Sequence, residues 1–253
     1  LRRNCISGFF FRLLCAIMEA GLQAARGKYV MFLNNDTQVE PEFARELLLA
    51  IKADKNIFSC QAKMLDYRNR QLIDDAGDFY CAFGWAFARG KGRKEERYLK
   101  KDRIFASCAG AAIYRKDLVE KAGYFDEQHF AYLEDVDLGY RARPMGYVNY
   151  FVPTARVYHM GSATTGSMHN EFKVRLSARN SLYMAYKNMP MWQLILNSPL
   201  LLVGIALKFF FFSGKHLGKE YRQGISEGLA LCKKENKIAY RRGKFGNYWK
   251  IQL

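Results

Sequence analysis

A short apolar segment that ends abruptly in polar residues constrains the fold of this chain more than any other feature. The run Tyr29–Leu33 is rich in residues that favour β-structure, and the polar residues Asn34–Thr37 follow it directly. A run of this length bounded by turn residues is typical of a buried strand. Pro41 then opens a stretch with apolar residues at helical spacing, namely Phe43, Leu47, Leu48 and Ile51. A strand, a polar turn and a helix predict an α/β fold, in which ligands bind at the carboxyl ends of the strands.

The segments that follow extend this α/β pattern as far as about residue 187. Regular patterns predict helices at Lys116–Ala122 and Leu133–Met145 and strands at Val148–Val152 and Arg156–His159. Between Ile57 and Arg103 the pattern weakens into short β-like pieces, so we expect a variable loop region there. The apolar start, Leu1–Met18, is expected to be a helix, because Glu19 stands where a signal peptide would need a small residue.

The last third of the chain changes character. Helical patterning covers Phe172–Tyr186, and an uncharged stretch then runs from Asn188 to Leu207. This stretch is about as long as a membrane-spanning helix, but polar residues and two prolines interrupt it. Three interpretations stay open: a helix lying in the membrane interface, which we favour, a true span, and a buried core helix. We therefore expect a domain at 1–187 and a basic, helical, membrane-associated region at 188–253.

Composition excludes some classes of protein and favours others. Half of the residues are hydrophobic, which excludes a disordered chain. A formal net charge of +16 predicts attraction to polyanions, for which nucleic acid, anionic lipid and phosphorylated substrates are the candidates. The six cysteines include no CxxC pair, so structural zinc is not expected, and they suit a reduced core. The basic excess lies at Lys91–Lys101 and after Lys208, and this favours a membrane-facing surface.

The polar turn after the first strand is a candidate metal site. The carboxylate of Asp36, helped by the amide of Asn34, can hold a hard divalent ion while phosphate oxygens complete its coordination. Asn and Asp are also the ordinary residues of a turn after a strand, so the pattern alone allows both interpretations.

A second candidate site is a group of five carboxylates within twelve residues: Asp126, Glu127, Glu134, Asp135 and Asp137. Crowding of like charges raises carboxyl pKa values toward those useful for a general base. Acidic residues are also stabilised at helix N-termini, and Arg141 can form an ordinary ion pair with Asp137 one turn earlier. His159 follows a predicted strand, which favours a place in the same cleft as Asp36, although a structural role is the common one for a single His.

Taken in order, these motifs resemble the family 2 glycosyltransferases of the GT-A fold, especially bacterial rhamnosyltransferase-like members that build surface polysaccharides. The resemblance runs from about Gly21 to Pro190. Gly27–Thr37 is similar to the family strand that ends in a DxD-type motif, with Asn34 and Asp36 at its outer positions. Further similar segments are Ser107–Ala112 beneath the acceptor site, Gly123–Glu127 after it, the Glu-Asp motif in Tyr132–Leu138, and the pair Arg179-Asn180.

The resemblance implies a fold and a set of site residues. The fold would be α/β, a GT-A (Rossmann-like) mixed sheet flanked by helices, with a C-terminal helical membrane-associated tail. Asp135 would be the general base, with Glu134 beside it. The other implied roles are metal binding by Asp36 and His159, donor binding by Asn34, Asn35, Asp36 and Arg179, and acceptor binding by Gly110 and Asp137.

The resemblance also implies cofactors, partners and a location. Mg²⁺ or Mn²⁺ would bind the diphosphate of a UDP- or dTDP-linked sugar, and the sugar would pass with inversion to a glycan or lipid-linked acceptor. An anionic membrane surface would be a partner and nucleic acid would not, and the enzyme would act at the cytoplasmic face of the cell membrane. Only 33 residues precede Asn34, fewer than in the family, so we expect the nucleotide-binding N-terminus to be truncated or altered.

Two other hypotheses compete with sugar transfer. One is a metal-dependent phosphoesterase acting on nucleic acid, which the net charge and the carboxylate cluster would suit. The other is an inactive, membrane-associated glycosyltransferase fragment, which the short N-terminus and the apolar tail would suit.

Overall fold

The computed structural model describes residues 18–161 and 170–252, and the predicted helix at Leu1–Met18 lies almost wholly outside them. Within these residues the chain forms two compact units. The first comprises 18–79 and 87–161. The second comprises Tyr80–Ala86 together with 170–252.

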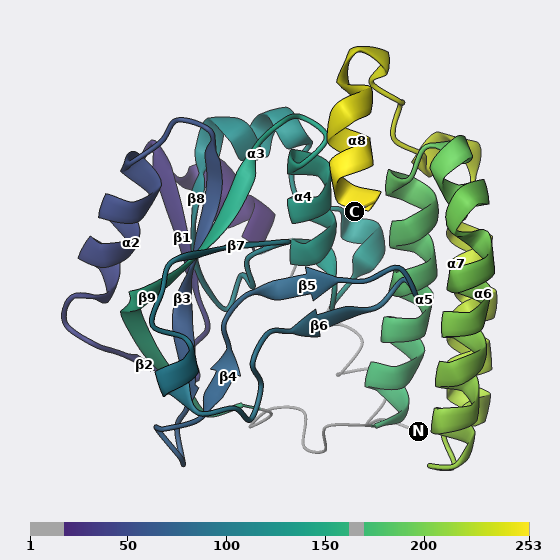
Figure 1. Ribbon diagram of the computed structural model, residues 1–253, viewed down its shortest axis with the longest axis horizontal. Helices are drawn as coiled ribbons and strands as arrows, with labels where there is room; N and C mark the ends of the chain where they lie inside the picture. Colours follow the sequence, from purple (N-terminus) through teal and green to yellow (C-terminus); the bar gives the residue numbers. More distant parts are fainter. Residues whose placement is uncertain (1–17, 162–169, 253) are drawn as a thin grey trace. The chain divides into compact units, whose positions relative to one another are not determined.

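A mixed sheet of seven strands forms the centre of the first unit (Figure 1). The strand order is β1-β8-β3-β9-β2, with β4 paired to β3 and β7 paired to β9. Only β3 and β9 run parallel, and the other pairs are antiparallel. The strands are β1 (Tyr29–Leu33), β2 (Thr37–Val39), β3 (Ile57–Asp66), β4 (Ile73–Asp75), β7 (Asp102–Ile104), β8 (Ala111–Arg115) and β9 (Val148–His159). A separate two-stranded sheet pairs β5 (Asp78–Tyr80) with β6 (Ala86–Ala88).

Helices cover the two faces of this sheet, and the alternation of β8 shows how. Ala111 and Ile113 pack in one core cluster with α2 (Phe43–Lys52), whereas Ala112 and Tyr114 pack in another with α3 (Lys116–Ala122) and α4 (Glu134–Ala142). Successive side chains of a strand point to opposite faces, so β8 contributes to both cores. Short 3-10 turns lie at η1 (Glu95–Arg97) and η2 (Glu127–His129). The mixed sheet flanked by helices that the sequence predicts is confirmed.

The expectation of a variable loop region between Ile57 and Arg103 is wrong, because β3 is a central strand of the sheet. Polar residues at alternate positions of β3 hide the apolar pattern of a buried strand. Ser59, Gln61 and Lys63 are each at most 1% exposed. Ser59 is hydrogen-bonded to Asn149, Gln61 to Asp75, and Lys63 to Glu95, so none of these polar groups is buried without a partner.

A second correction concerns the last strand of the sheet along the chain. The two strands predicted at Val148–Val152 and Arg156–His159 are one continuous strand, β9, which continues through Pro153. The register between β3 and β9 shifts at this point, between Ala62 and Lys63. An irregularity of this kind accommodates a proline that cannot donate a hydrogen bond to the neighbouring strand.

The second unit is helical: α5 (Glu171–Asn188), α6 (Met191–Ser213), α7 (Gly218–Leu231), 3-10 turns η3 (Lys234–Asn236) and η4 (Arg242–Lys244), and α8 (Phe245–Gln252). Glycines let α7 approach α5 closely, since a methyl group at Gly224 would overlap the Arg175 carbonyl. This packing places α5 in the second unit, so the compact units divide the chain differently from the predicted boundary at 187. Of the described helices, α6 is long and apolar enough to cross a membrane, a weak indication by itself.

The close packing of α4 leads to a first prediction. Gly139 on α4 lies against Ala106, and a methyl group at Gly139 would stand only 2.5 Å from the Ala106 Cβ. We expect Gly139→Ala to lower the free energy of unfolding by about 1–3 kcal/mol through overpacking. Denaturant titration followed by circular dichroism measures this change.

The control for this prediction is Gly21→Ala, in the helical segment 18–24, where no atom would lie within 4 Å of the added methyl group. Alanine favours a helix over glycine by about 1 kcal/mol, so Gly21→Ala should stabilise or leave stability unchanged. Equal effects of the two substitutions would contradict the proposed packing of α4.

Candidate functional site

The strand pairing brings Asp36 and His159 together, as the sequence suggests. Thr37 of β2 pairs with His159 of β9, and Asp36 stands one residue before this pair. The Nε2 atom of His159 lies 3.3 Å from Oδ1 of Asp36. On its other side, Nδ1 of His159 lies 2.7 Å from Oδ2 of Asp74 in β4. One imidazole therefore stands between two carboxylates.

The chemistry of this group fits a divalent metal ion. When Nδ1 of a histidine donates to a carboxylate, the tautomer is fixed and the free Nε2 lone pair is available to a metal. Here Asp74 is that carboxylate, and the Nε2 atom of His159 faces Asp36. Metal binding by Asp36 and His159 stays a prediction. The hydrogen bond that His159 donates to Asp74 raises the pKa of His159 despite the opposing effect of burial. Burial alone would raise the pKa of Asp74, but hydrogen bonds from His159 and Lys91 outweigh it and lower this pKa.

Asp135 and Glu134 form the second part of the site, at the start of α4. Oδ2 of Asp135 accepts a hydrogen bond of 3.1 Å from the backbone N–H of Ala109. Burial raises the pKa of Asp135, although backbone hydrogen bonds from Ala109 and Val136 oppose this rise. Burial and then the charge of Asp135 raise the pKa of Glu134 to about 8. Oε2 of Glu134 is buried and has no hydrogen-bond partner among the described residues.

An unusual backbone delivers this pair of acids. Phe130, Tyr132 and Leu133 have φ angles of 65°, 67° and 67°, in the left-handed region that large side chains rarely adopt. Each such residue costs on the order of 1–3 kcal/mol and persists only where the surrounding structure enforces it. Three of them within four residues place Glu134 and Asp135 by a strained turn, which is typical of functional sites.

Two further carboxylates in this region are not predicted by the sequence. Asp75 of β4 accepts hydrogen bonds from the Gln61 side chain at 2.9 Å and from the Gly77 N–H at 2.7 Å. Burial raises the pKa of Asp75 to about 6 in spite of these bonds. Burial also raises the pKa of Asp78, and the charge of Asp75 raises it further. The run Asp74-Asp75-Ala76-Gly77-Asp78 places three aspartates within five residues. This pattern could have indicated a site, but the interpretation of the region as a variable loop overlooks it.

Hydrogen bonds within the first unit link the surroundings of the Asp36–His159 pair to those of Asp135. Gln61 links the two, since its Nε2 donates to Asp75 and its Oε1 accepts from the Cys108 N–H at 2.7 Å. Cys108 adjoins Ala109, which bonds to Asp135, and Asp75 adjoins Asp74, which bonds to His159.

Asn34 lies against Gly110. Asn34 N–H donates to the Gly110 carbonyl at 2.9 Å, and a methyl group at Gly110 would stand 3.0 Å from the Asn34 side chain. Thr37 Oγ1 bonds to the Asn34 carbonyl at 2.6 Å and fixes the turn that carries Asn35 and Asp36. The structure thus brings Asn34, Asp36, Gly110, Asp135 and His159 into one region, which we call the acidic site, together with Glu134, Asp74, Asp75 and Asp78.

Asp137 and Arg179 differ from these residues. Asp137 is fully buried and accepts a hydrogen bond of 2.9 Å from Arg141, whose guanidinium also bonds to the Ala122 and Tyr124 carbonyls. This burial favours a structural role over the acceptor contact that the sequence predicts. Arg179 lies on α5 in the second unit, so its place beside a donor phosphate stays a prediction.

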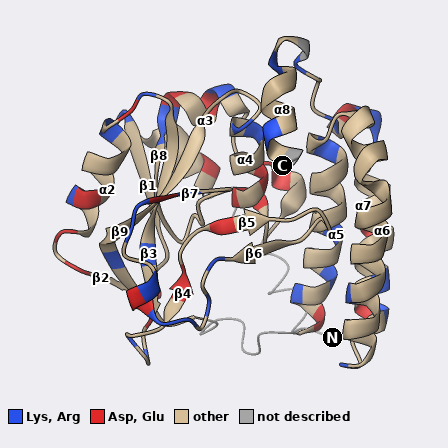
Figure 2. Cartoon of the chain, viewed as in Figure 1, with Lys and Arg blue, Asp and Glu red and all other residues tan. Residues whose placement is uncertain are grey.

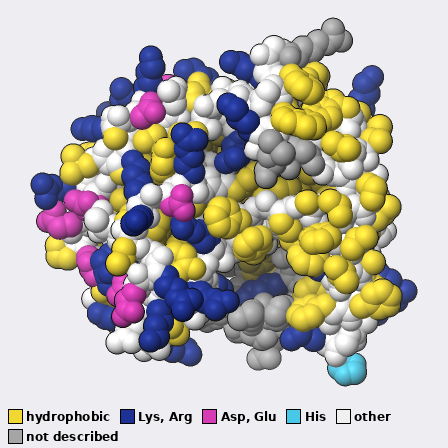
Figure 3. Space-filling view, in the orientation of Figure 1, with side chains coloured by type: hydrophobic (Ala, Val, Ile, Leu, Met, Phe, Trp, Pro, Cys, Tyr) yellow, Lys and Arg dark blue, Asp and Glu magenta, His cyan; other side chains and the backbone are white. Residues whose placement is uncertain are grey.

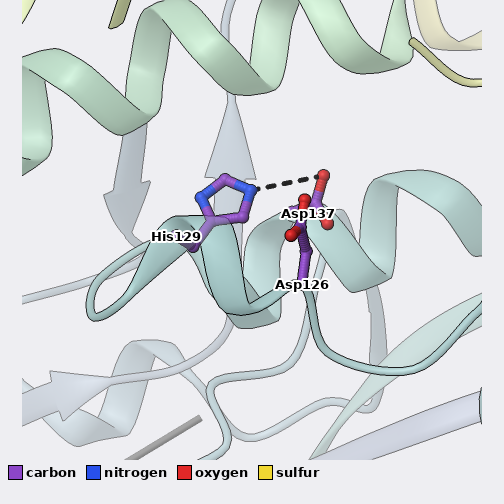
Figure 4. A group of neighbouring side chains, drawn as sticks. All are labelled: Asp126, His129 and Asp137. Atoms are coloured by element: carbon purple, nitrogen blue, oxygen red, sulfur yellow. Dashed lines mark ion pairs between the residues drawn. The ribbon is translucent and has the colours of Figure 1, made fainter. Parts of the chain in front are cut away.

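The described residues contain one group of three whose ligand atoms all lie close enough to share a metal ion: Asp126, His129 and Asp137. Figure 4 shows the imidazole of His129 directed at Asp137, with 3.5 Å between Nε2 and Oδ1. Both side chains are fully buried, and Arg141 already neutralises Asp137. The arrangement fits an internal ion-pair network that holds η2 against α4. This network is separate from the Asp36–His159 pair.

The buried acids of the acidic site lead to a second prediction. Glu134 has a folded-state pKa near 8, above its ordinary value of 4.5, so between these values the folded protein binds more protons than the unfolded chain. Stability should therefore be fully present below about pH 4.5 and fall as the pH rises toward 8. We expect Glu134→Gln to make this fall shallower by up to about 1.4 kcal/mol per pH unit.

Urea titrations at several pH values between 5 and 8 measure this slope for both proteins. Glu171→Gln, on the second unit, is a control that should leave the slope unchanged. Identical slopes for Glu134→Gln and the unmodified protein would show that Glu134 ionises normally.

Comparisons with known proteins concern the family and the fold of the chain. Residues 14–123 match the family model described as Glycosyl transferase family 2. The matched residues include Asp36, Asp75 and Gly110 and end before Glu134. The N-acetylglucosaminyl-diphospho-decaprenol L-rhamnosyltransferases of two Mycobacterium tuberculosis strains, CDC 1551 / Oshkosh and ATCC 25618 / H37Rv, are 33% identical over 90 residues. These residues are 36% of this chain, and the chain spans 28% of the length of those relatives.

A solved structure extends the comparison to the fold. The crystal structure of GalNAc-T7 with UDP, GalNAc and Mn²⁺ superposes with a TM-score of 0.53 at 16% identity, over 68% of this chain and 34% of that chain. At this identity the likeness concerns the fold alone. The fold that the resemblance implies is thereby confirmed: the chain has the GT-A fold. Its residues 14–123 match the model of glycosyl transferase family 2, and 90 of its residues are similar in sequence to rhamnosyltransferases.

Proposed function

We propose that this protein transfers a sugar from a UDP- or dTDP-linked donor to a glycan or lipid-linked acceptor, with inversion at the anomeric carbon, in the synthesis of cell-surface polysaccharide. The observation that carries this proposal is the acidic site, in which hydrogen bonds through Asp74, Asp75 and Gln61 link the Asp36–His159 pair to the surroundings of the part-buried Asp135. A family 2 domain supports sugar transfer as the reaction.

Asp135 is the general base in this proposal. Its carboxylate takes the proton of an acceptor hydroxyl while the hydroxyl oxygen forms a bond to the anomeric carbon. The bond between that carbon and the donor phosphate breaks, and its electron pair leaves with the nucleoside diphosphate. Burial supports this role, since it raises the pKa of Asp135 and makes the ionised carboxylate a stronger base. Glu134, whose pKa burial raises to about 8, keeps its proton near neutral pH.

Asp36 and His159 hold Mg²⁺ or Mn²⁺ in this proposal, and Asp74 orients His159. A bound divalent ion would supply positive charge to the diphosphate of the donor. The surroundings support this, because several carboxylates gather here while the cations that contact them are His159 and Lys91. GalNAc-T7, the solved neighbour, contained UDP and Mn²⁺. Asn34, Asn35 and Arg179 are proposed to bind the donor, and Gly110 is proposed to bind the acceptor. Asp137 is fully buried and paired with Arg141, so we propose a structural role for it in place of the acceptor contact.

Two further observations concern the acceptor and the location. The relatives from Mycobacterium tuberculosis are named for a diphospho-decaprenol acceptor, which supports a lipid-linked acceptor here. The apolar helix α6 supports association with a membrane, and we place the enzyme at its cytoplasmic face, where nucleotide-sugars are available. Figure 2 shows lysines and arginines distributed along the helices of the second unit, which suits an anionic lipid surface.

The role of Asp135 gives a third prediction. We expect Asp135→Asn to lower the rate of sugar transfer by about 10²–10⁴-fold, because it removes the base, while circular dichroism shows a retained fold. Turnover of nucleotide-sugar in the presence of acceptor lipid extract measures the rate.

Two variants sharpen this test. Asp117→Asn, on the exposed face of α3, is a control that should retain full activity. Asp75→Asn removes another acid of the site whose pKa is raised, and a larger loss for this variant than for Asp135→Asn would assign the base to Asp75 instead.

The metal pair gives a fourth prediction. We expect Mn²⁺ to be required for binding of UDP or dTDP in isothermal titration, and Asp36→Asn to abolish this metal-dependent binding. Asp74→Asn should weaken Mn²⁺ binding about 10–100-fold, because it releases the imidazole of His159. Chelator is the matched control for each titration. Unchanged Mn²⁺ affinity in both variants would place the metal elsewhere, with Asp126, His129 and Asp137 as the next group to test.

A further inference from the structure

The second unit contains an apolar cavity that the acidic site does not use. Its volume is about 230 Å³, larger than an apolar cavity of about 150 Å³ that takes up benzene. Residues of α5, α6 and α7 line it together with Phe83, Gly84 and Trp85 from the segment Tyr80–Ala86. The wall is almost wholly hydrocarbon, with side chains such as Leu201, Ile205 and Ile225. A cavity of this kind favours a hydrocarbon chain over a polar ligand.

One charged group, Lys208, lines this apolar cavity. Its Nζ lies 5.3 Å from the centre of the Trp85 ring, and Trp85 Nε1 donates to the Gly204 carbonyl on the same helix. No carboxylate or other hydrogen-bond partner of Lys208 is found among the described residues. Burial lowers the pKa of Lys208 to about 8, so the ammonium is largely charged at neutral pH yet poorly solvated. An anionic ligand that pairs with such a poorly solvated cation stabilises its charge.

The surroundings of the cavity indicate where such a partner comes from. The outer side of α6 exposes Ile195, Leu202 and Phe210, each at least 65% exposed. In the space-filling view, hydrophobic side chains gather over the helices of the second unit (Figure 3). Residues 171–253 contain fifteen Lys and Arg against four Glu. Apolar and basic surface together is the combination that attracts anionic lipid.

We propose that the α5–α7 cavity binds the single hydrocarbon chain of an anionic membrane lipid, with the lipid headgroup paired to the ammonium of Lys208. The chain fills the apolar wall, and the headgroup supplies the negative charge that Lys208 lacks. This binding is independent of sugar transfer, and its test needs no transfer activity, so it stands or falls separately from the proposed function.

The test uses Trp85 as a reporter in the full chain. The sequence has three tryptophans, so Trp192→Phe and Trp249→Phe leave Trp85 as the single emitter, directly on the cavity wall. Decyl phosphate, decanol and inorganic phosphate are titrated below the micelle concentration while Trp85 emission is followed. We expect saturable binding of decyl phosphate, binding of decanol at least tenfold weaker, and no response to inorganic phosphate.

Matched variants separate the charge from the cavity. Lys208→Gln should lower the affinity for decyl phosphate to that for decanol. Ser181→Phe, which fills the cavity from α5, should abolish the emission response to both ligands. Lys215→Ala is the control, since Lys215 also lies over an aromatic ring, that of Phe211, but is exposed. Circular dichroism establishes that each variant is folded. Equal affinities for decyl phosphate in Lys208→Gln, Ser181→Phe and Lys215→Ala, or no saturable response in the parent protein, would overturn the proposal.

Discussion

The parallel pairing of β3 with β9 is the contact on which the first unit depends. It is the one parallel pair of the seven-stranded sheet, and it joins a strand rich in buried polar groups to the strand that ends in His159. Because β4 pairs with the far end of β3, the same pairing brings Asp74 to His159. The hydrogen bonds of Ser59 with Asn149 and Ser107 hold the near end of the two strands together. A buried polar network of this kind specifies one register, since any slip would leave its members without partners.

The acidic site places like charges together at a cost to the folded protein. Burial raises the pKa values of Asp75, Asp78, Glu134 and Asp135, which means that each carboxylate would be more stable in water than where it is. The left-handed residues before α4 add backbone strain at the same place. Stability lost in one small region is typical of a site arranged for chemistry, and the apolar cores on both faces of the sheet compensate for it.

The sequence predicts much of this fold because its local patterns agree with the tertiary structure. The apolar run of β1, the helical spacing of α2 and the capping glycine of α3 are all properties of neighbouring residues. The helices of the second unit follow for the same reason. The association of α5 with α7 does not, because it depends on glycines that allow close approach between distant segments. The strand β3 was hidden because Ser59, Gln61 and Lys63 look like solvent-facing residues until their buried partners are known.

The candidate site divides in the same way. Asp36, Asp135 and His159 can be selected from their motifs, since each follows or begins a recognisable element. Asp75 and Asp78 cannot, because their significance comes from hydrogen bonds and burial that only the fold creates. The group of Asp126, His129 and Asp137 shows the reverse case. Asp126 and Asp137 form part of the acidic cluster in the sequence, yet the burial of Asp137 and its ion pair with Arg141 indicate a structural network.

The alternation of β4 has a consequence for how this protein can vary. Asp74 and Asp75 are consecutive residues that serve opposite sides of one strand, the first bonded to His159 and the second to Gln61. Inserting or deleting a single residue within β4 would exchange the two sides and disconnect both bonds at once. Changes in length are therefore excluded from Ile73–Asp75, whereas the exposed turn at Tyr67–Gln71 can absorb them. Indels among natural variants should accumulate at that turn, while β4 changes by substitution only.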